Sequence, residues 1–157
     1  MNEKFCDNKS VGVILKNKDD ILLLDRARFP FGLAAPAGHI DEHGGPEDAA
    51  VNEVFEEVGI VIAQSSLIKV IDNRRVENVC RRVNGDYHIW NVYTAETDTR
   101  EIRASEEETR GAMWYPPERL QAIANRTKEI SSREEKIGSQ VLELIWLDFF
   151  VELGYAR

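Results

Sequence analysis

The stretch that decides the fold runs from residue 38 to residue 60 and reads GHIDEHGGPEDAAVNEVFEEVGI. A glycine-containing loop leads directly into a short segment with helical periodicity. Pro46 suits the first position of a helix, and Gly59 suits the residue just past its C-terminal end. The spacing therefore predicts a short helix that is entered through a tight loop.

Three glutamates crowd this predicted helix. Glu53 lies three and four positions before Glu56 and Glu57, so their carboxylates are neighbours, and no lysine or arginine between residues 49 and 60 offsets them. A divalent cation would offset them, since hard cations such as Mg²⁺ take oxygen ligands and act on phosphates. The alternative is a solvated acidic face. On either interpretation, the glutamates are expected to lie opposite a buried stripe formed by Val51, Val54, Phe55 and Val58.

The flanks of the helix favour a metal site, because the whole segment resembles the signature of the Nudix hydrolases. That signature runs glycine, five residues, glutamate, seven residues, then Arg-Glu-apolar-x-Glu-Glu-x-Gly-apolar. Pro36-Ala37 is similar to the Pro-Gly that precedes it, and two positions depart: Gly44 replaces the first glutamate and Asn52 replaces the arginine. The residues in register are Gly38, Glu53, Val54, Glu56, Glu57, Gly59 and Ile60.

The resemblance implies a chemistry and a set of residues for it. Glu53, Glu56 and Glu57 would bind Mg²⁺, with Mn²⁺ as the alternative, and the backbone carbonyl of Ala37 would complete the shell. Glu108, chosen by its distance from a downstream tryptophan, would add a metal ligand or a catalytic base. A metal in such a site neutralises phosphate charge and activates water, so a phosphoanhydride bond would be cleaved by water attack at phosphorus.

Basic residues near the motif are candidates for substrate binding. Arg26, Arg28 and His39 flank the predicted metal site, and guanidinium groups are suited to phosphate recognition. Further candidates follow the motif: Arg74, Arg75, Arg81 and Arg82.

No zinc site is expected from spacing. His39, His43 and His88 lack metal-ligand spacing, and neither Cys6 nor Cys80 belongs to a CxxC pair. The two cysteines are therefore interpreted as idle thiols in a reducing compartment.

The rest of the chain predicts a single domain, residues 1–157, of the α/β class. Strands interspersed with helices indicate an α/β/α sandwich around a mixed sheet, which is also what the Nudix resemblance implies. Asn84-Gly85 predicts a hairpin between two of the strands. A helix is expected from Pro116-Pro117 to about Arg126, and a final one at about 132–154, capped by Ser131 or Ser132 and buried either against the sheet or in a homodimer. The strands are expected at residues 11–15, 21–24, 33–37, 67–71, 76–83, 87–95 and 111–115.

Composition narrows the class of function. The net charge of −8 argues against non-specific nucleic-acid binding, and the N-terminus lacks the apolar core of a signal peptide. The longest late apolar run, residues 144–151, is too short to span a bilayer. We expect a cytoplasmic enzyme that hydrolyses a nucleoside triphosphate or a related small nucleotide. The alternative, motivated by Gly44 and Asn52, is a binding or sensor module that uses the same fold without turnover.

Overall fold

The protein, represented by a computed structural model that describes residues 3–157, is built on a seven-stranded mixed sheet. Its main strand order is β3-β2-β1-β6-β5, with β4 pairing with β1 and β7 with β2. Among the strand pairings within residues 3–157, only that of β1 with β6 is parallel. The strands are β1 Lys9–Asn17, β2 Asp20–Arg26, β3 Leu33–Ala34, β4 Ala37–His39, β5 Ile68–Val76, β6 His88–Glu96 and β7 Thr109–Tyr115.

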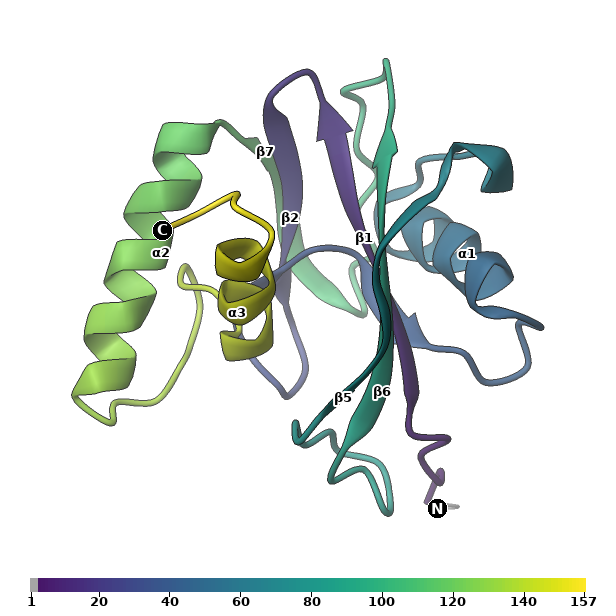
Figure 1. Cartoon of the computed structure of the whole chain (residues 1–157), viewed down its shortest axis with the longest axis horizontal. Helices are drawn as coiled ribbons and strands as arrows, with labels where there is room; N and C mark the ends of the chain where they lie inside the picture. The colour runs from purple at the N-terminus through teal and green to yellow at the C-terminus, as the bar shows by residue number, and fades with distance from the viewer. Residues whose placement is uncertain (1–2) are drawn as a thin grey trace.

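Helices cover both faces of the sheet, which confirms the predicted α/β/α sandwich. Figure 1 shows α1 on one side of the strands and α2 with α3 on the other. A short 3₁₀ helix, η1, follows α1. The bounds are α1 Pro46–Val58, η1 Gln64–Ser66, α2 Pro117–Ser132 and α3 Leu144–Glu152.

The central strand β1 is buried on both faces, not on one face as its alternating pattern suggested. Val11, Val13 and Leu15 point to the core beneath α1, together with Val54 and Val58. Ile14 points to the opposite core. Both faces are covered because α3 packs its aromatic side chains on the second face; a Cβ added at Gly12 would lie 2.5 Å from the Trp146 ring.

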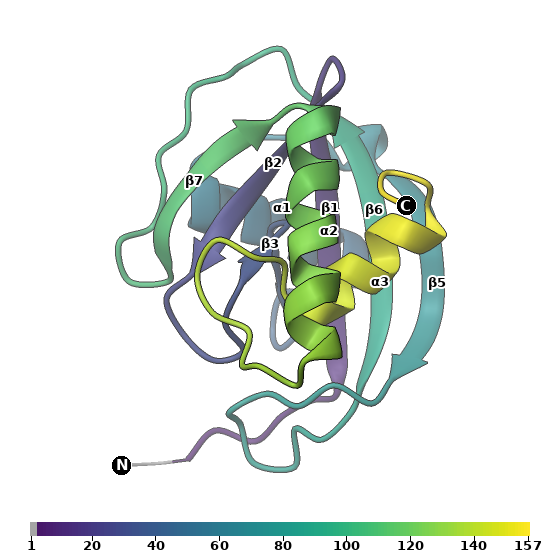
Figure 2. The same ribbon diagram turned by 90° about the vertical axis from the view of Figure 1, so that its left-hand side faces the viewer.

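The C-terminal helix begins later than the expected position near residue 132. α2 continues to Ser132, so the two serines end that helix and do not cap the next one. The chain then returns in an extended form, because Leu142 bridges to Leu33 and its amide donates to Thr127 Oγ1 at 2.9 Å. α3 starts at Leu144 and lies on the same side of the sheet as α2 (Figure 2). Its side chains Trp146 and Phe150 are buried in the core on that side, as expected for a helix that covers the sheet.

The predicted hairpin at Asn84-Gly85 is also wrong. β5 extends from Ile68 to Val76 and pairs with β6 directly, which leaves residues 77–87 as a long connecting loop. The Asn84-Gly85 turn lies inside this loop, where Asn84 has a φ of 60°. The loop is fixed by the N-terminal segment, since Cys6 N–H donates to Val83 O at 2.8 Å. Tertiary contacts have therefore replaced strand pairing at residues 77–83.

Within residues 3–157, none of the helices combines the length and the apolar character needed to cross a membrane.

Candidate metal and nucleotide site

The acidic helix α1 is fixed at both ends by backbone geometry. Pro46 occupies its first turn, and the Asp48 carboxylate accepts a hydrogen bond from Gly45 N–H at 3.0 Å. Gly59 ends the helix with a φ of 72°, and its N–H donates to Phe55 O at 2.9 Å. These contacts fix where the helix begins and where it ends.

The buried side of α1 differs from the one expected from the sequence. Phe55 is 56% exposed, although it was assigned to the buried stripe, while Glu57 is only 4% exposed. The reason is that β4 packs beside α1 and covers the side that carries Glu57. Ala37 N–H of β4 donates to Glu57 Oε1 at 2.8 Å, so the buried carboxylate has a fixed partner.

Glu53 lies directly over the glycine that opens the motif. A Cβ added at Gly38 would be 2.3–2.5 Å from the carboxylate atoms of Glu53. No larger residue at position 38 would leave the Glu53 carboxylate where it is. The motif glycine is thus explained by the close approach of the Glu53 carboxylate.

Replacing Gly38 with alanine is expected to move the Glu53 carboxylate and to weaken Mg²⁺ binding about tenfold. Stability should change little, because the displaced atoms are the mobile end of a side chain. The measurement is the Mg²⁺ concentration that gives half-maximal turnover. Gly138→Ala is the matched control, because no atom lies within 4 Å of a Cβ at that loop position. An unchanged Mg²⁺ requirement in Gly38→Ala would contradict the assignment.

The two inner carboxylates are strained electrostatically. Burial, aided by the nearby charges of Glu56 and Glu108, raises the pKa of Glu53 to about 8. Burial and the charge of Glu53 raise the pKa of Glu57 well above its usual range. Their oxygen atoms form the kind of donor set that Mg²⁺ prefers, and a bound divalent cation would stabilise both in the charged form. The donor set therefore fits the metal that the resemblance implies.

These carboxylates face a cavity of about 140 Å³ that contains most of the predicted site. Glu108 comes from the residues before β7 and lines it, as do Ala37 and Gly38 of β4. The basic residues proposed for the substrate are present as well: Arg26, Arg28 and His39.

Glu56 differs from the other two glutamates because it is exposed outside this cavity. It belongs to a neighbouring group in which ligand atoms of His43, Glu53 and Glu56 lie within 4.8 Å of one another. His43 Nε2 is 3.6 Å from Glu53 Oε1, and Asn52 Nδ2 is 3.3 Å from His43 Nδ1. Asn52 stands where the family has an arginine. It contacts His43, and His43 contacts Glu53, so the link between Asn52 and Glu53 is indirect.

Of the four later arginines, the structure brings two to the cavity. Arg81 and Arg82 line it from the 77–87 loop, and Arg82 pairs with Asp41 through two contacts of 2.7 and 3.0 Å. Arg74 and Arg75 pair elsewhere, with Glu152 and Glu77. The sequence alone could not separate these pairs, because the loop that carries Arg81 and Arg82 was taken for a strand.

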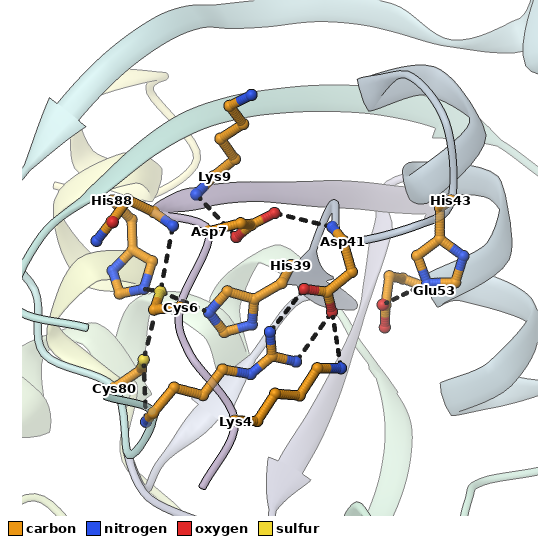
Figure 3. Close-up of polar contacts among 12 residues, drawn as sticks. Lys4, Cys6, Asp7, Lys9, His39, Asp41, His43, Glu53, Cys80 and His88 are labelled. Atoms are coloured by element: carbon orange, nitrogen blue, oxygen red, sulfur yellow. Dashed lines mark hydrogen bonds and ion pairs between the residues drawn. The ribbon is translucent and has the colours of Figure 1, made fainter. Parts of the chain in front are cut away.

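His39 has a second set of neighbours besides the cavity. Its Nε2 lies 3.3 Å from Cys6 Sγ, and its ring packs edge-on against His88 (Figure 3). Burial, with the charge of Arg82 as a further cause, lowers the pKa of His39 to about 4, so the imidazole is neutral at pH 7. A neutral ring contributes no charge to phosphate binding.

One buried acid near the site was not anticipated. Glu143 lies just before α3, and its Oε2 is 3.8 Å from Arg26 Nε without a hydrogen-bond partner. Burial raises its pKa to about 7. Arg26 also donates from Nε to Pro30 O at 2.6 Å, so its guanidinium is fixed beside the cavity. No sequence signal links residues 26 and 143. They come together because residues 141–143 run beside Leu33 of β3.

The family profile described as the NUDIX domain matches residues 7–134, which include the whole acidic site. The chain belongs to the Nudix hydrolase family. No curated protein matches it. The Nudix assignment therefore rests on the profile, and solved structures show how the fold compares.

Several solved Nudix structures share this fold. The MutT protein from Methanosarcina mazei Go1 has a TM-score of 0.64 at 17% identity, with 98% of this chain and 96% of that chain covered. The dihydroneopterin triphosphate pyrophosphohydrolase of E. coli gives 0.62 at 23% identity, with 84% and 94% covered. A bifunctional NMN adenylyltransferase/ADP ribose pyrophosphatase from Francisella tularensis, complexed with AMP and a manganese ion, gives 0.59 at 20% identity, with 98% and 42% covered.

These likenesses establish the Nudix fold and not a substrate, because each identity is below 25%. Some relatives are much longer: the chain spans 46% of a MutT/nudix family protein from Enterococcus faecalis, at 22% identity over 73% of this chain, with a TM-score of 0.54.

Proposed function

We propose that this Nudix protein hydrolyses a phosphoanhydride bond in a nucleoside diphosphate linked to another group. Mg²⁺, or Mn²⁺, would be bound by Glu53, Glu56 and Glu57 with the carbonyl of Ala37. The observation that carries the proposal is the pair formed by the buried Glu57 and the partly buried Glu53, which repel each other and face a cavity. When bound, the metal would supply positive charge to the diphosphate and to the attacking water.

The residues of the chain have distinct tasks in this proposal. The N–H of Ala37 fixes Glu57, and Gly38 gives room to Glu53, so both acids are oriented before substrate arrives. Glu108 lines the same cavity and is proposed as a further ligand or as the base that takes a proton from water. Pre-oriented groups matter here because phosphoryl transfer depends on positioning and charge stabilisation.

The proposed substrate is a small anionic nucleotide, with a nucleoside triphosphate as the default. Arg28 and Arg81 line the cavity beside the acids, and their guanidinium groups suit phosphate oxygens. Two of the solved structures compared above are named for anionic phosphate compounds, dihydroneopterin triphosphate and ADP ribose.

A second candidate function, a sensor that binds nucleotide without turnover, is favoured by one observation. Gly44, in place of the first family glutamate, has a φ of 99°, and a Cβ there would meet Asp48 Oδ2 at 2.8 Å. Position 44 therefore supplies no carboxylate to the proposed metal site.

The experiment that separates the two functions is phosphate or pyrophosphate release from a panel of nucleotides and nucleotide sugars. It is run with Mg²⁺, with Mn²⁺ and with neither. Metal-dependent release supports the hydrolase and identifies the substrate. Thermal stabilisation by metal plus nucleotide, with no release from any compound, supports the sensor.

Asn52→Ala is expected to weaken Mg²⁺ binding and turnover by about tenfold, because His43 loses its partner and no longer orients Glu53. His43→Ala should have a similar effect, and the double variant should be little worse than either, since the two act in series. Turnover and Mg²⁺ dependence of the three variants are measured together. A gain of activity in Asn52→Arg above the wild type would contradict the idea that the site is organised around asparagine.

A further inference from the structure

Four side chains with metal-binding atoms meet on the side of β4 that faces the N-terminal segment. Cys6 precedes β1, His39 ends β4, Cys80 lies in the 77–87 loop and His88 begins β6. One ligand atom from each lies within 4.8 Å of all the others. The group includes both cysteines and two of the three histidines in the sequence (Figure 3).

The separations match a tetrahedral zinc site. Zinc lies about 2.3 Å from thiolate sulfur and about 2.0–2.1 Å from imidazole nitrogen, so tetrahedral ligands are about 3.8 Å apart for two sulfurs and about 3.6 Å for sulfur and nitrogen. The two Sγ atoms of Cys6 and Cys80 are 3.8 Å apart. Cys6 Sγ is 3.3 Å from Nε2 of His39 and 3.3 Å from Nε2 of His88.

The surroundings orient these atoms as they do around bound metals. His88 Nδ1 lies 2.9 Å from Asn78 O, to which it donates, so the lone pair of Nε2 points to the group. Each cysteine sulfur accepts a backbone N–H from two residues further on, Cys6 from Asn8 at 3.3 Å and Cys80 from Arg82 at 3.4 Å. Such bonds stabilise thiolates.

The turn that carries Cys80 is also shaped around its thiol. Cys80 N–H donates to Gly85 O at 2.7 Å, which closes a tight loop. A Cβ added at Gly85 would lie 2.2 Å from Cys80 Sγ, so only glycine leaves room for the sulfur. The glycine of the mispredicted hairpin thus has its role here.

We propose that Cys6, His39, Cys80 and His88 bind one Zn²⁺ as a structural Cys₂His₂ site. It lies beside the proposed Mg²⁺ site and shares no ligand with it, although His39 and Cys80 also line the acidic cavity. Two thiolates and two neutral imidazoles in a tetrahedron select zinc over hard cations. The proposal does not depend on the hydrolase activity. It revises the expectation that the chain has no zinc site, which was based on the spacing of cysteines and histidines. The proposed ligands come from four segments that only the fold brings together.

The site would connect the N-terminal segment to the wall of the acidic cavity. Arg81 and Arg82 follow Cys80 directly and line that cavity with Glu53 and Glu57. Zinc at Cys80 and His88 would fix both ends of the loop that carries these arginines. His39, proposed from the sequence to contact substrate, would serve the zinc site instead.

The test is metal binding to the full, reduced chain in excess Mg²⁺, which occupies oxygen ligands without competing for thiolates. We expect about one Zn²⁺ per chain by elemental analysis. Co²⁺ should give thiolate charge-transfer bands and the intense visible bands of tetrahedral coordination. Trypsin cleavage after Arg81 and Arg82 should slow when zinc is added.

Cys80→Ser is the main variant, because Cys80 lies in a loop and is only partly buried, and His43→Gln is the matched control outside the group. The serine variant should lose the thiolate bands and weaken zinc binding by at least about a hundredfold, whereas the control should bind as the wild type does. Three results would overturn the proposal: no zinc or cobalt on folded, reduced protein; undiminished binding in Cys80→Ser; or a Cys6–Cys80 disulfide whose reduction yields no metal binding.

Discussion

Glu57→Gln is expected to lower metal-dependent turnover about a thousandfold, the largest effect of any single substitution considered. Glutamine keeps the shape of the side chain and can still accept the hydrogen bond from Ala37 N–H at 2.8 Å. It cannot supply the negative charge that the metal requires. The loss should therefore appear in catalysis and in Mg²⁺ affinity, measured as turnover over a range of Mg²⁺ concentrations.

The same substitution should not destabilise the metal-free protein. Neutralising Glu57 removes its repulsion with Glu53 and the cost of burying a charge, so the melting temperature at pH 8 should be equal or higher. Glu107→Gln, in an exposed position next to Glu108, is the matched control and should leave turnover unchanged. A Glu57→Gln protein that melts far earlier yet keeps its turnover would show that the residue is structural.

The metal-free protein should lose stability as pH rises from 6.5 to 8. The pKa of Glu53 is about 8 in the folded state and near its ordinary value of 4.5 when unfolded, so the folded state binds more protons in this range. The stabilisation is complete below the unfolded pKa and is lost as pH rises through the folded pKa. Glu53 alone accounts for roughly 1–2 kcal/mol of the free energy of unfolding over this window, and the raised pKa of Glu57 acts in the same direction.

The window is chosen to avoid the histidines. Burial lowers the pKa values of His39 and His88. Their contribution to the pH dependence of stability therefore has the opposite sign, and it acts mainly at pH values below about 6.5. Urea unfolding without Mg²⁺ at pH 6.5 and 8 measures the effect, and Glu53→Gln/Glu57→Gln should make the slope shallower. A smaller slope should remain in the double variant, because burial raises the pKa of Glu143 to about 7. Added Mg²⁺ should restore stability at pH 8 in the wild type only. A wild-type pH slope no steeper than that of the double variant would refute the coupling of these two acids.

The sequence predicted the helix of the site well because its signals are local. Pro46, Gly59 and the 3.6-residue period depend on neighbours along the chain, so the bounds of α1 followed from them. The face of the helix did not follow. Phe55 and Glu57 exchanged their expected environments because β4, and not solvent, lies beside Glu57.

The late part of the chain was harder to predict for the same reason. The expected helix at 132–154 and the hairpin at Asn84-Gly85 both had good local signals. The structure instead pairs residues 141–143 with Leu33 and joins Val83 to the N-terminal segment. Contacts between distant segments override local propensity there, because they replace the hydrogen bonds of the local form and also bury Val141 and Leu142 in the core.

The sequence by itself therefore determined the α/β/α fold class and the acidic helix, both of which depend on periodicity and on a contiguous motif. The tertiary structure alone decided which carboxylates are buried, which arginines line the cavity, and that Cys6, His39, Cys80 and His88 meet. These properties depend on how β4, β6, the N-terminal segment and the 77–87 loop are placed in space. Residues as far apart as 6 and 88 carry no spacing signal until the sheet brings them together.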